Sequence, residues 1–504
     1  MLQKITIALL SLAVCLPSVA AAYHTPIDII RRGAAHNARL DKRETSTKHD
    51  DPFKNFQYYN KQTASFWVNG TAIPDVDFDV GESYAGLLPI SDKKDESRKL
   101  WFWFFPTTGA VKDEIVVWLN GGPGCSDLEG LLQENGPFLW KWGTFKPVPN
   151  PYAWTNLTNM IWVEQPVGTG FSQGKPSATS ETDVAEQFLG FFENFIETFG
   201  LQNKKIYVTG ESYAGAYVPY IVDAMHAKKD KEHFDARGLL MYDPVLTDDV
   251  VGQQVPVAKF VDYWSPLFGL DAVTMDSLHK KAASCGYTSY FEKNLVYPPK
   301  GPFPPAPKLT SGCDVWSLVF DAVLLKNPCF SVYEITTTCP MLWDVLGFPG
   351  SFAYLPEGAE IYFNRTDVQK AINAPHMEWE ECSTDDVFVG GDSSHPSSWS
   401  VLPRAIDNNE RSIIGHGLLD FILMTNGTLL AIQNMTWGGK QGFQKPPVEP
   451  FVVPYEKQGI MGVTHTERKL TYVEIALSGH MVPQFQPGAG YRHLEYLLGR
   501  IPSL

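Results

Sequence analysis

The pattern of apolar and polar positions predicts alternating strands and helices along most of the chain. Apolar runs at residues 84–90 and 100–105 flank a charged turn, which is typical of a β-hairpin. Phenylalanines at helical spacing in residues 183–199 indicate a helix with one face in the core. Further strand-like runs lie at residues 115–119, 159–164, 206–208, 238–242, 411–414 and 470–477. This alternation favours an α/β fold with a mostly parallel central sheet and helices on both faces.

The alternation weakens between residues 249 and 402. Most of the cysteines lie in this segment, together with a proline-rich loop at residues 297–307. We interpret residues 249–402 as a disulfide-rich cap domain inserted into the sheet domain. Residues 53–248 and 403–504 are then the two parts of the core.

The N-terminal residues have the features of a secretory signal. Lys4 precedes an apolar run over residues 5–19, and three alanines follow at residues 20–22. We predict that residues 1–22 are a signal peptide and that the protein is secreted, with a vacuole as the less favoured destination. Residues 23–52 are polar and contain dibasic pairs, so a propeptide and a disordered arm both remain open.

Composition narrows the classes of partner and cofactor. The net charge of −15 argues against nucleic acid and anionic membrane surfaces, and no membrane anchor is visible. No cysteine or histidine cluster has metal-ligand spacing, so we expect neither a metal nor another cofactor. Six cysteines follow the signal, which suggests three disulfides in an exported chain. Candidate glycosylation sites are Asn69, Asn156, Asn364, Asn426 and Asn434.

A candidate nucleophile lies directly after the run at residues 206–208. Gly210-Glu211-Ser212-Tyr213-Ala214 joins this strand to a potential helix, which is the nucleophile elbow of α/β-hydrolases. Glycine and alanine two residues either side of the serine avoid clashes in so sharp a turn. A weaker interpretation is an ordinary Gly-Ser turn.

Chain order in this fold class places an acid and then a histidine after later strands. Asp420 follows the strand at residues 411–414, and His480 follows the strand at residues 470–477. Asp407 is expected in a turn. His416 and His493 are expected to be structural.

Three motifs then resemble the serine carboxypeptidases. They are WLNGGPGCS at residues 118–126, GESYAG at residues 210–215 and GHMVP at residues 479–483, in that order. Shorter segments between them also match, and the resemblance covers nearly the whole chain from about residue 84. The chain looks most like fungal members.

The resemblance implies an enzyme that releases C-terminal residues from peptides and proteins at acidic pH through an acyl-enzyme. Ser212 would attack the carbonyl, His480 would move the proton, and Asp420 would hold the imidazole. Backbone amides of Gly122 and Tyr213 would form the oxyanion hole. The substrate's terminal carboxylate would be held by Asn120, Gly121, Glu134 and Glu211.

Glu134 and Glu211 would meet an anion, so they can bind it only if they share a proton. This predicts the tightest peptide binding at acidic pH. Tyr213, Ile422 and Leu423 would line the pocket for the penultimate side chain, and Leu423 would make that pocket narrower and more apolar.

The resemblance also implies disulfide pairings. Cys125 would pair with Cys382, and the cap would contain nested Cys285–Cys339 and Cys313–Cys329 bonds. The chain departs from the family pattern at Asp127, at Leu418, Leu423 and Met424 around the acid, and at Phe485. Acyltransferase, hydroxynitrile lyase and a catalytically dead binding protein are the competing interpretations. The intact triad argues against a dead protein, and the retained Asn120, Glu134 and Glu211 favour a peptidase.

Overall fold

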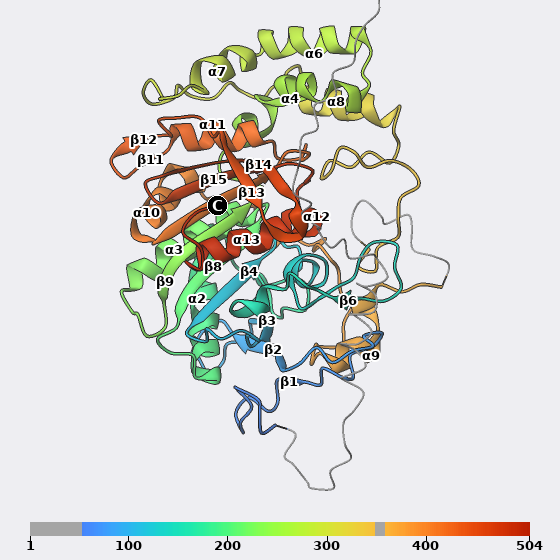
Figure 1. Cartoon of the computed structure of the whole chain (residues 1–504), viewed down its shortest axis with the longest axis vertical. Helices are drawn as coiled ribbons and strands as arrows, with labels where there is room; N and C mark the ends of the chain where they lie inside the picture. The colour runs from blue at the N-terminus through green and yellow to red at the C-terminus, as the bar shows by residue number, and fades with distance from the viewer. Residues whose placement is uncertain (1–52, 348–357) are drawn as a thin grey trace, which may run out of the picture. The chain divides into compact units, whose positions relative to one another are not determined.

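The computed structural model describes residues 53–347 and 358–504. The predicted signal peptide and the segment at residues 23–52 lie outside the described residues. An eleven-stranded sheet runs through the protein in the order β1-β2-β3-β7-β4-β8-β9-β10-β15-β14-β13 (Figure 1). Its parallel centre consists of β7 (Asn159–Glu164), β4 (Glu114–Leu119), β8 (Lys205–Glu211), β9 (Asp235–Tyr242), β10 (Arg411–Gly417) and β15 (Leu470–Ile475).

Antiparallel strands extend both edges of this centre. One edge carries β3 (Lys99–Phe105), β2 (Ser83–Pro89) and β1 (Trp67–Val68), and so confirms the predicted hairpin. The other edge carries β14 (Gly459–Glu467) and β13 (Glu449–Val453), which were not predicted. Pro450 and Gly462 interrupt the apolar pattern there, and much of β13 is exposed.

Helices cover both faces of the sheet, as predicted. The helix α2 (Glu181–Phe199) packs beside α3 (Ala214–Lys228), and α10 (Val401–Asn408) packs on α3. The α2 phenylalanines are buried in the core that this layer forms with the sheet. On the opposite face lies α13 (Pro487–Leu497), within a second apolar cluster rich in tryptophan. The expected turn residue Asp407 instead lies near the end of α10.

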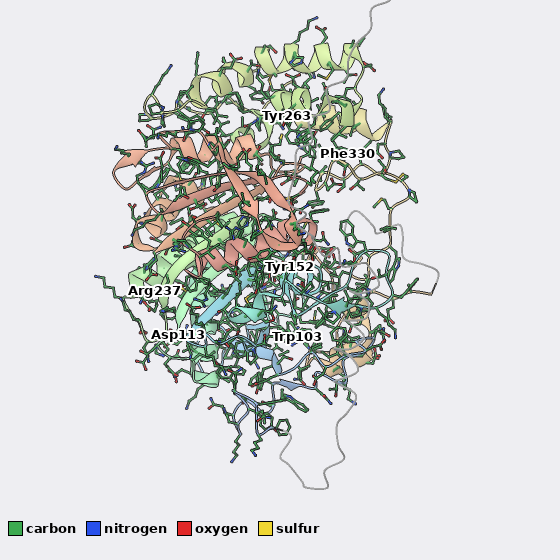
Figure 2. All side chains as sticks on the ribbon, viewed as in Figure 1. Trp103, Asp113, Tyr152, Arg237, Tyr263 and Phe330 are labelled. Atoms are coloured by element: carbon green, nitrogen blue, oxygen red, sulfur yellow. A yellow bond between two sulfur atoms is a disulfide. The ribbon has the colours of Figure 1, made fainter. Side chains whose placement is uncertain are left out.

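A third apolar cluster contains the cap helices, which Figure 1 shows beyond α11 (Thr425–Asn434). Leu419, Phe421 and Met424, from the chain that follows β10, are buried in the same cluster. Figure 2 shows Tyr263 and Phe330 at this end of the molecule. The helices are α4 (Val257–Tyr263), α5 (Ser265–Phe268), α6 (Ala272–Ser284), α7 (Tyr287–Asn294) and α8 (Val315–Leu324). The short helix α9 (Thr366–Ala371) belongs to the tryptophan-rich cluster instead.

The disulfides confirm one prediction and correct two. Cys125 pairs with Cys382, as predicted. The nested cap pairing of Cys285–Cys339 and Cys313–Cys329 is wrong, because the bonds are Cys285–Cys313 and Cys329–Cys339. Cys285 ends α6 and Cys313 precedes α8, and these two helices lie side by side. Both cap disulfides therefore close local loops.

The glycosylation candidates differ in accessibility. Asn69, Asn156 and Asn434 are exposed, whereas Asn364 and Asn426 are half-buried. The Asn364 side-chain amide also donates to the Trp379 carbonyl at 3.0 Å. Glycosylation of the three exposed residues therefore stays the better-supported prediction. Within the described ranges, no helix combines the length and the apolar character that a membrane span requires.

Candidate active site

Ser212 sits on a strained turn between β8 and α3. Its φ angle is 61°, in a region that side chains other than glycine rarely adopt. Its amide donates to the Tyr242 carbonyl at 2.9 Å, which ties the turn to β9. A Cβ at Gly210 would lie 2.7 Å from the Cβ of Ala214 and 2.2 Å from the Leu119 carbonyl oxygen. The elbow therefore requires small residues on both sides of the serine, as its sequence indicates.

The predicted acid and histidine meet beyond the carboxyl ends of β10 and β15, just as Ser212 lies beyond the carboxyl end of the parallel strand β8. Asp420 Oδ2 lies 2.6 Å from Nδ1 of His480. Asp420 Oδ1 accepts the amides of Ile422 at 2.8 Å and Leu423 at 3.1 Å, which fixes the carboxylate. Nδ1 of His480 therefore carries the proton that faces Asp420. Its Nε2 is buried without a hydrogen-bond partner among the described residues, so this nitrogen is available as a base.

The two competing histidines have structural environments. His416 Nε2 donates to the Leu423 carbonyl at 2.6 Å, and its Nδ1 lies 3.1 Å from the Thr428 hydroxyl. His493 Nδ1 lies 3.0 Å from the Tyr242 hydroxyl. Burial lowers the pKa of His416 to about 4 and that of His493 to about 3. Both rings therefore stay neutral across the working range of most enzymes.

The loop from Asn120 to Ser126 packs closely against Ser212, the predicted nucleophile. A Cβ at Gly121 would lie 2.6 Å from both the Ser212 Cβ and the Tyr213 amide nitrogen. Gly122 has a φ of 110°, which also favours glycine. Gly121 and the Tyr213 amide thus lie beside Ser212, and the oxyanion-hole role of the Gly122 and Tyr213 amides stays a prediction.

Two predicted carboxylate-binding acids meet next to this loop. Glu134 lies in the short helix η1 (Gly130–Asn135), and Glu211 ends β8. Burial, together with nearby carboxylates, raises the pKa of both groups well above the usual value. The Asn120 side-chain amide donates to Glu211 at 3.2 Å. The pair therefore has the protonated, desolvated character that recognition of an anion requires.

A third buried acid, Glu129, was missed from the sequence. The Asn120 side-chain amide donates to Glu129 at 2.6 Å, and carboxylate oxygens of Glu129, Glu134 and Glu211 lie within 4.8 Å of one another. Burial, with a contribution from Asp344, raises the pKa of Glu129 to about 8. Glu129 comes five residues before Glu134 in the printed sequence, and this spacing was the only available signal.

The family departure at Asp127 has a structural explanation. Its carboxylate accepts the Asn120 amide with one oxygen and the Val163 amide, at 3.1 Å, with the other. Asp127 therefore fastens the loop to β7. The Cys125–Cys382 bond anchors the same loop on its other side, where the Ser126 amide donates to the Glu381 carbonyl at 2.6 Å.

The predicted pocket residues lie on two elements next to the triad. The Tyr213 hydroxyl donates to Asp392 at 2.7 Å, which orients its ring. Ile422 and Leu423 are half-buried on the turn that carries Asp420. Phe485 ends the short helix α12 (Val482–Phe485), with its ring centroid 6.2 Å from that of Trp142. The pocket role of these residues stays a prediction.

The loop closed by the Cys329–Cys339 disulfide is hydrogen-bonded both to the turn that carries Asp420 and to the loop that carries His480. The Tyr333 carbonyl accepts the His480 amide at 2.8 Å, and the Val332 carbonyl accepts the Phe421 and Ile422 amides at 2.9 Å each. The rings of Tyr333 and His480 lie 5.3 Å apart between centroids. One disulfide-closed loop therefore holds Asp420 and His480, the two predicted triad members that follow β10 and β15.

We expect the Cys329→Ser/Cys339→Ser variant to lose about 10- to 100-fold in kcat, because a small displacement of the triad is costly. The matched control is Cys285→Ser/Cys313→Ser, which also removes one cap disulfide but one that joins the end of α6 to the start of α8. Its kcat should stay close to wild type. Steady-state kinetics and thermal melting of both variants check the prediction, and equal kcat losses would contradict it.

Buried carboxyls should make the fold more stable in acid than at neutral pH. Burial raises the pKa of Asp344 to about 6, of Glu164 to about 7 and of Glu129 to about 8. In the unfolded chain these groups titrate near pH ~4, so above that pH the native state binds more protons. Stability should then fall as pH rises from ~4 to about 8, by about 1.4 kcal/mol per pH unit for each proton retained, with the slope becoming smaller as pH passes 6, 7 and 8. Calorimetric melting between pH 5 and 8 checks this, and a constant or rising Tm would contradict it.

Two groups of buried side chains have the composition of metal ligands. They are Asp243, Asp420 and His480, and Glu129, Glu134 and Glu211, with ligand atoms within 4.8 Å in each group. Burial raises the pKa of Glu129, Glu134, Glu211 and Asp243, and protonated carboxyls are poor ligands. The expectation of a metal-free enzyme stays a prediction.

Comparisons with known proteins agree with this geometry. The model of the serine carboxypeptidase family matches residues 74–500. A probable serine carboxypeptidase from Arthroderma benhamiae is 57% identical over 92% of this chain and 90% of its own length. Serine-type carboxypeptidase F from Aspergillus niger is 47% identical over 99% of this chain and 98% of its own length.

The fold is also shared with a solved structure. A prohormone-processing carboxypeptidase from Saccharomyces cerevisiae matches with a TM-score of 0.70 and 22% identity, over 87% of this chain and 96% of the other. The comparison confirms the α/β-hydrolase fold that the sequence predicts. With its family match and these fungal relatives, the chain belongs to the serine carboxypeptidase family.

Proposed function

We propose that this serine-type carboxypeptidase is exported and removes C-terminal amino acids from peptides and proteins at acidic pH. The observation that carries the proposal is the buried pair of Glu134 and Glu211, whose carboxylate oxygens lie within 4.8 Å of each other. Glu211 directly precedes Ser212 in the chain, so the pair lies next to the nucleophile. The pair supplies a site for the terminal carboxylate of a substrate.

The triad geometry supports acyl transfer through Ser212. Nε2 of His480 takes the serine proton as the hydroxyl oxygen attacks the last peptide carbonyl, and Asp420 holds the imidazolium that forms. The Gly122 and Tyr213 amides stabilise the oxyanion. His480 then gives its proton to the departing amino acid, and water releases the acyl group by the reverse steps.

Recognition of the terminal carboxylate makes the enzyme an exopeptidase. Glu134 and Glu211, sharing a proton, hydrogen-bond to the carboxylate, and Asn120 and Gly121 complete the site. As pH rises, the pair loses its proton and repels the substrate. Peptide binding therefore weakens toward neutral pH.

Several further features belong to the same proposal. The penultimate side chain enters an apolar pocket lined by Tyr213, Ile422 and Leu423, which favours apolar residues at that position. Residues 249–402 are inserted between core segments 53–248 and 403–504, and the cap helices α4 to α8 lie within this insertion. Residues 1–22 direct export, with secretion favoured over a vacuole, and glycans on exposed Asn69, Asn156 and Asn434 accompany that route.

Digestion of an N-terminally blocked peptide at pH 5 tests this function. Mass spectrometry should show stepwise loss of residues from the C-terminus, despite the N-terminal block. The same peptide with a C-terminal amide should be degraded much more slowly. Internal cleavage, or transfer of acyl groups without peptide hydrolysis, would contradict the proposal.

A further inference from the structure

A second buried carboxyl lies beside the triad acid, and the proposed mechanism does not use it. Asp243 directly follows β9, which is the parallel neighbour of β10. Its side chain is completely buried, and its two oxygens accept the Gly417 amide at 3.0 and 3.3 Å. Gly417 ends β10 just before the turn that carries Asp420. The main chain thus fixes Asp243 against that turn.

Asp243 lies close to the reacting groups. A carboxylate oxygen of Asp243, a carboxylate oxygen of Asp420 and a ring nitrogen of His480 all lie within 4.8 Å of one another. The buried carboxyl is therefore a direct neighbour of both groups. The side chain is a candidate to act on Asp420 and, through it, on His480.

Within the described residues, no positively charged side chain lies next to Asp243 and Asp420 to offset the repulsion between two carboxylates. His416 Nε2 lies 3.3 Å from Asp243 Oδ1, but this nitrogen donates to Leu423, and burial keeps the ring neutral. In the described part of the chain, no lysine or arginine forms an ion pair with Asp243 or Asp420. The other titratable neighbours that face Asp243 are Glu134, Glu211, Tyr242 and Tyr472.

Two adjacent carboxylates in such surroundings cannot both be ionised, so the pair keeps a proton. Asp420 is the better place for the negative charge, because it accepts two backbone amides and the imidazole N–H. Among the described residues, Asp243 accepts the Gly417 amide alone, and one of its oxygens lies 3.3 Å from His416 Nε2. Burial, followed by the charge of Asp420, raises the pKa of Asp243 well above the usual value, in agreement with this placement.

We infer that Asp243 is a protonated positioning residue whose carboxyl donates a hydrogen bond to the catalytic carboxylate of Asp420. The inference rests on the proposed triad role of Asp420. The bond holds the Asp420 carboxylate in place and withdraws part of its negative charge. Because a weaker negative charge stabilises imidazolium less, the acid limb of kcat/KM should lie at lower pH with Asp243 present than without it. This suits a peptidase that binds its substrates best at low pH.

The test compares Asp243→Asn with Asp243→Ala. The asparagine can accept the Gly417 amide with its oxygen and donate to Asp420 with its nitrogen, so kcat should stay within about threefold of wild type. Alanine removes the donor, and kcat should fall about 10- to 100-fold with KM little changed. The acid limb of kcat/KM should also move to higher pH in Asp243→Ala alone. A purely structural role would not move that limb.

Asp420→Asn, assayed in parallel, separates this inference from the proposed function. Full activity of Asp420→Asn would overturn the triad itself. A collapse of Asp420→Asn, together with wild-type behaviour of Asp243→Ala, would overturn only the role of Asp243. Equal losses in both Asp243 variants would also overturn it, because they would show that an ionised carboxylate is required. Thermal melting verifies that each variant folds. If Asp243→Ala does not fold, the kcat of Asp243→Asn alone tests the inference, and a loss well beyond threefold would overturn it.

Discussion

Replacing Ser212 with alanine is expected to reduce kcat by about 10⁴- to 10⁶-fold, with little change in KM. The substitution removes the attacking oxygen and leaves the oxyanion hole and the carboxylate site in place. Alanine also fits the elbow, because only one oxygen is deleted from a side chain whose Cβ is already accommodated beside Gly121. The loss should therefore be almost entirely chemical.

Steady-state hydrolysis of a blocked dipeptide, with equilibrium binding of a product peptide, measures the two effects separately. Thermal melting shows whether the Ser212→Ala fold is intact. The matched control is Ser289→Ala, which removes an exposed cap hydroxyl that donates to the Gly286 carbonyl at 3.1 Å. Retention of more than a few per cent of kcat in Ser212→Ala would show that another group is the nucleophile.

The second large effect is expected from the carboxyl pair. The Glu134→Ala/Glu211→Ala variant should lose about 10²- to 10⁴-fold in kcat/KM for peptides with a free C-terminus, because two hydrogen bonds to a charged group are removed. Hydrolysis of an ester that lacks the terminal carboxylate should change far less. Comparing the two substrates isolates carboxylate binding from catalysis. Equal losses on both substrates would indicate a damaged active site rather than a lost binding site.

Glutamine at the same two positions gives a finer result. The Glu134→Gln/Glu211→Gln variant keeps donors for the substrate carboxylate but cannot ionise. Its KM should be raised at pH 5 and should then stay flat toward pH 8, whereas the wild-type KM should climb as its pair loses the shared proton. Measuring KM of both enzymes from pH 5 to 8 shows whether KM rises with pH. A variant KM that rises as the wild-type KM does would contradict the account.

The sequence was informative wherever chemistry is encoded in a short stretch of chain. The elbow around Ser212, the loop at Asn120 and the strands that precede Asp420 and His480 each combine local structure with a recognisable motif. Their positions in the chain were therefore predictable. The structure brings Asp420 and His480 into contact, as expected.

What could not be predicted depends on strand register or on competing local contacts. Asp243 meets the triad because Tyr242 pairs with Gly415 across β9 and β10, and no local pattern gives that register. The hydrogen bond from the His480 amide to the Tyr333 carbonyl joins loops that are far apart in sequence. The nested cap disulfides were inferred by analogy. The actual bonds connect cysteines 28 and 10 residues apart, whereas the expected pairs were 54 and 16 residues apart.

The most direct test of carboxylate recognition at a serine active site is a comparison of a blocked dipeptide with its C-terminal amide, from pH 3 to 8. Wild-type enzyme should release the terminal amino acid from the free acid, with KM lowest in acid and rising toward neutral pH. It should act poorly on the amide, and Ser212→Ala should act on neither. Equal turnover of acid and amide, or a KM for the free acid that does not change with pH, would contradict the account.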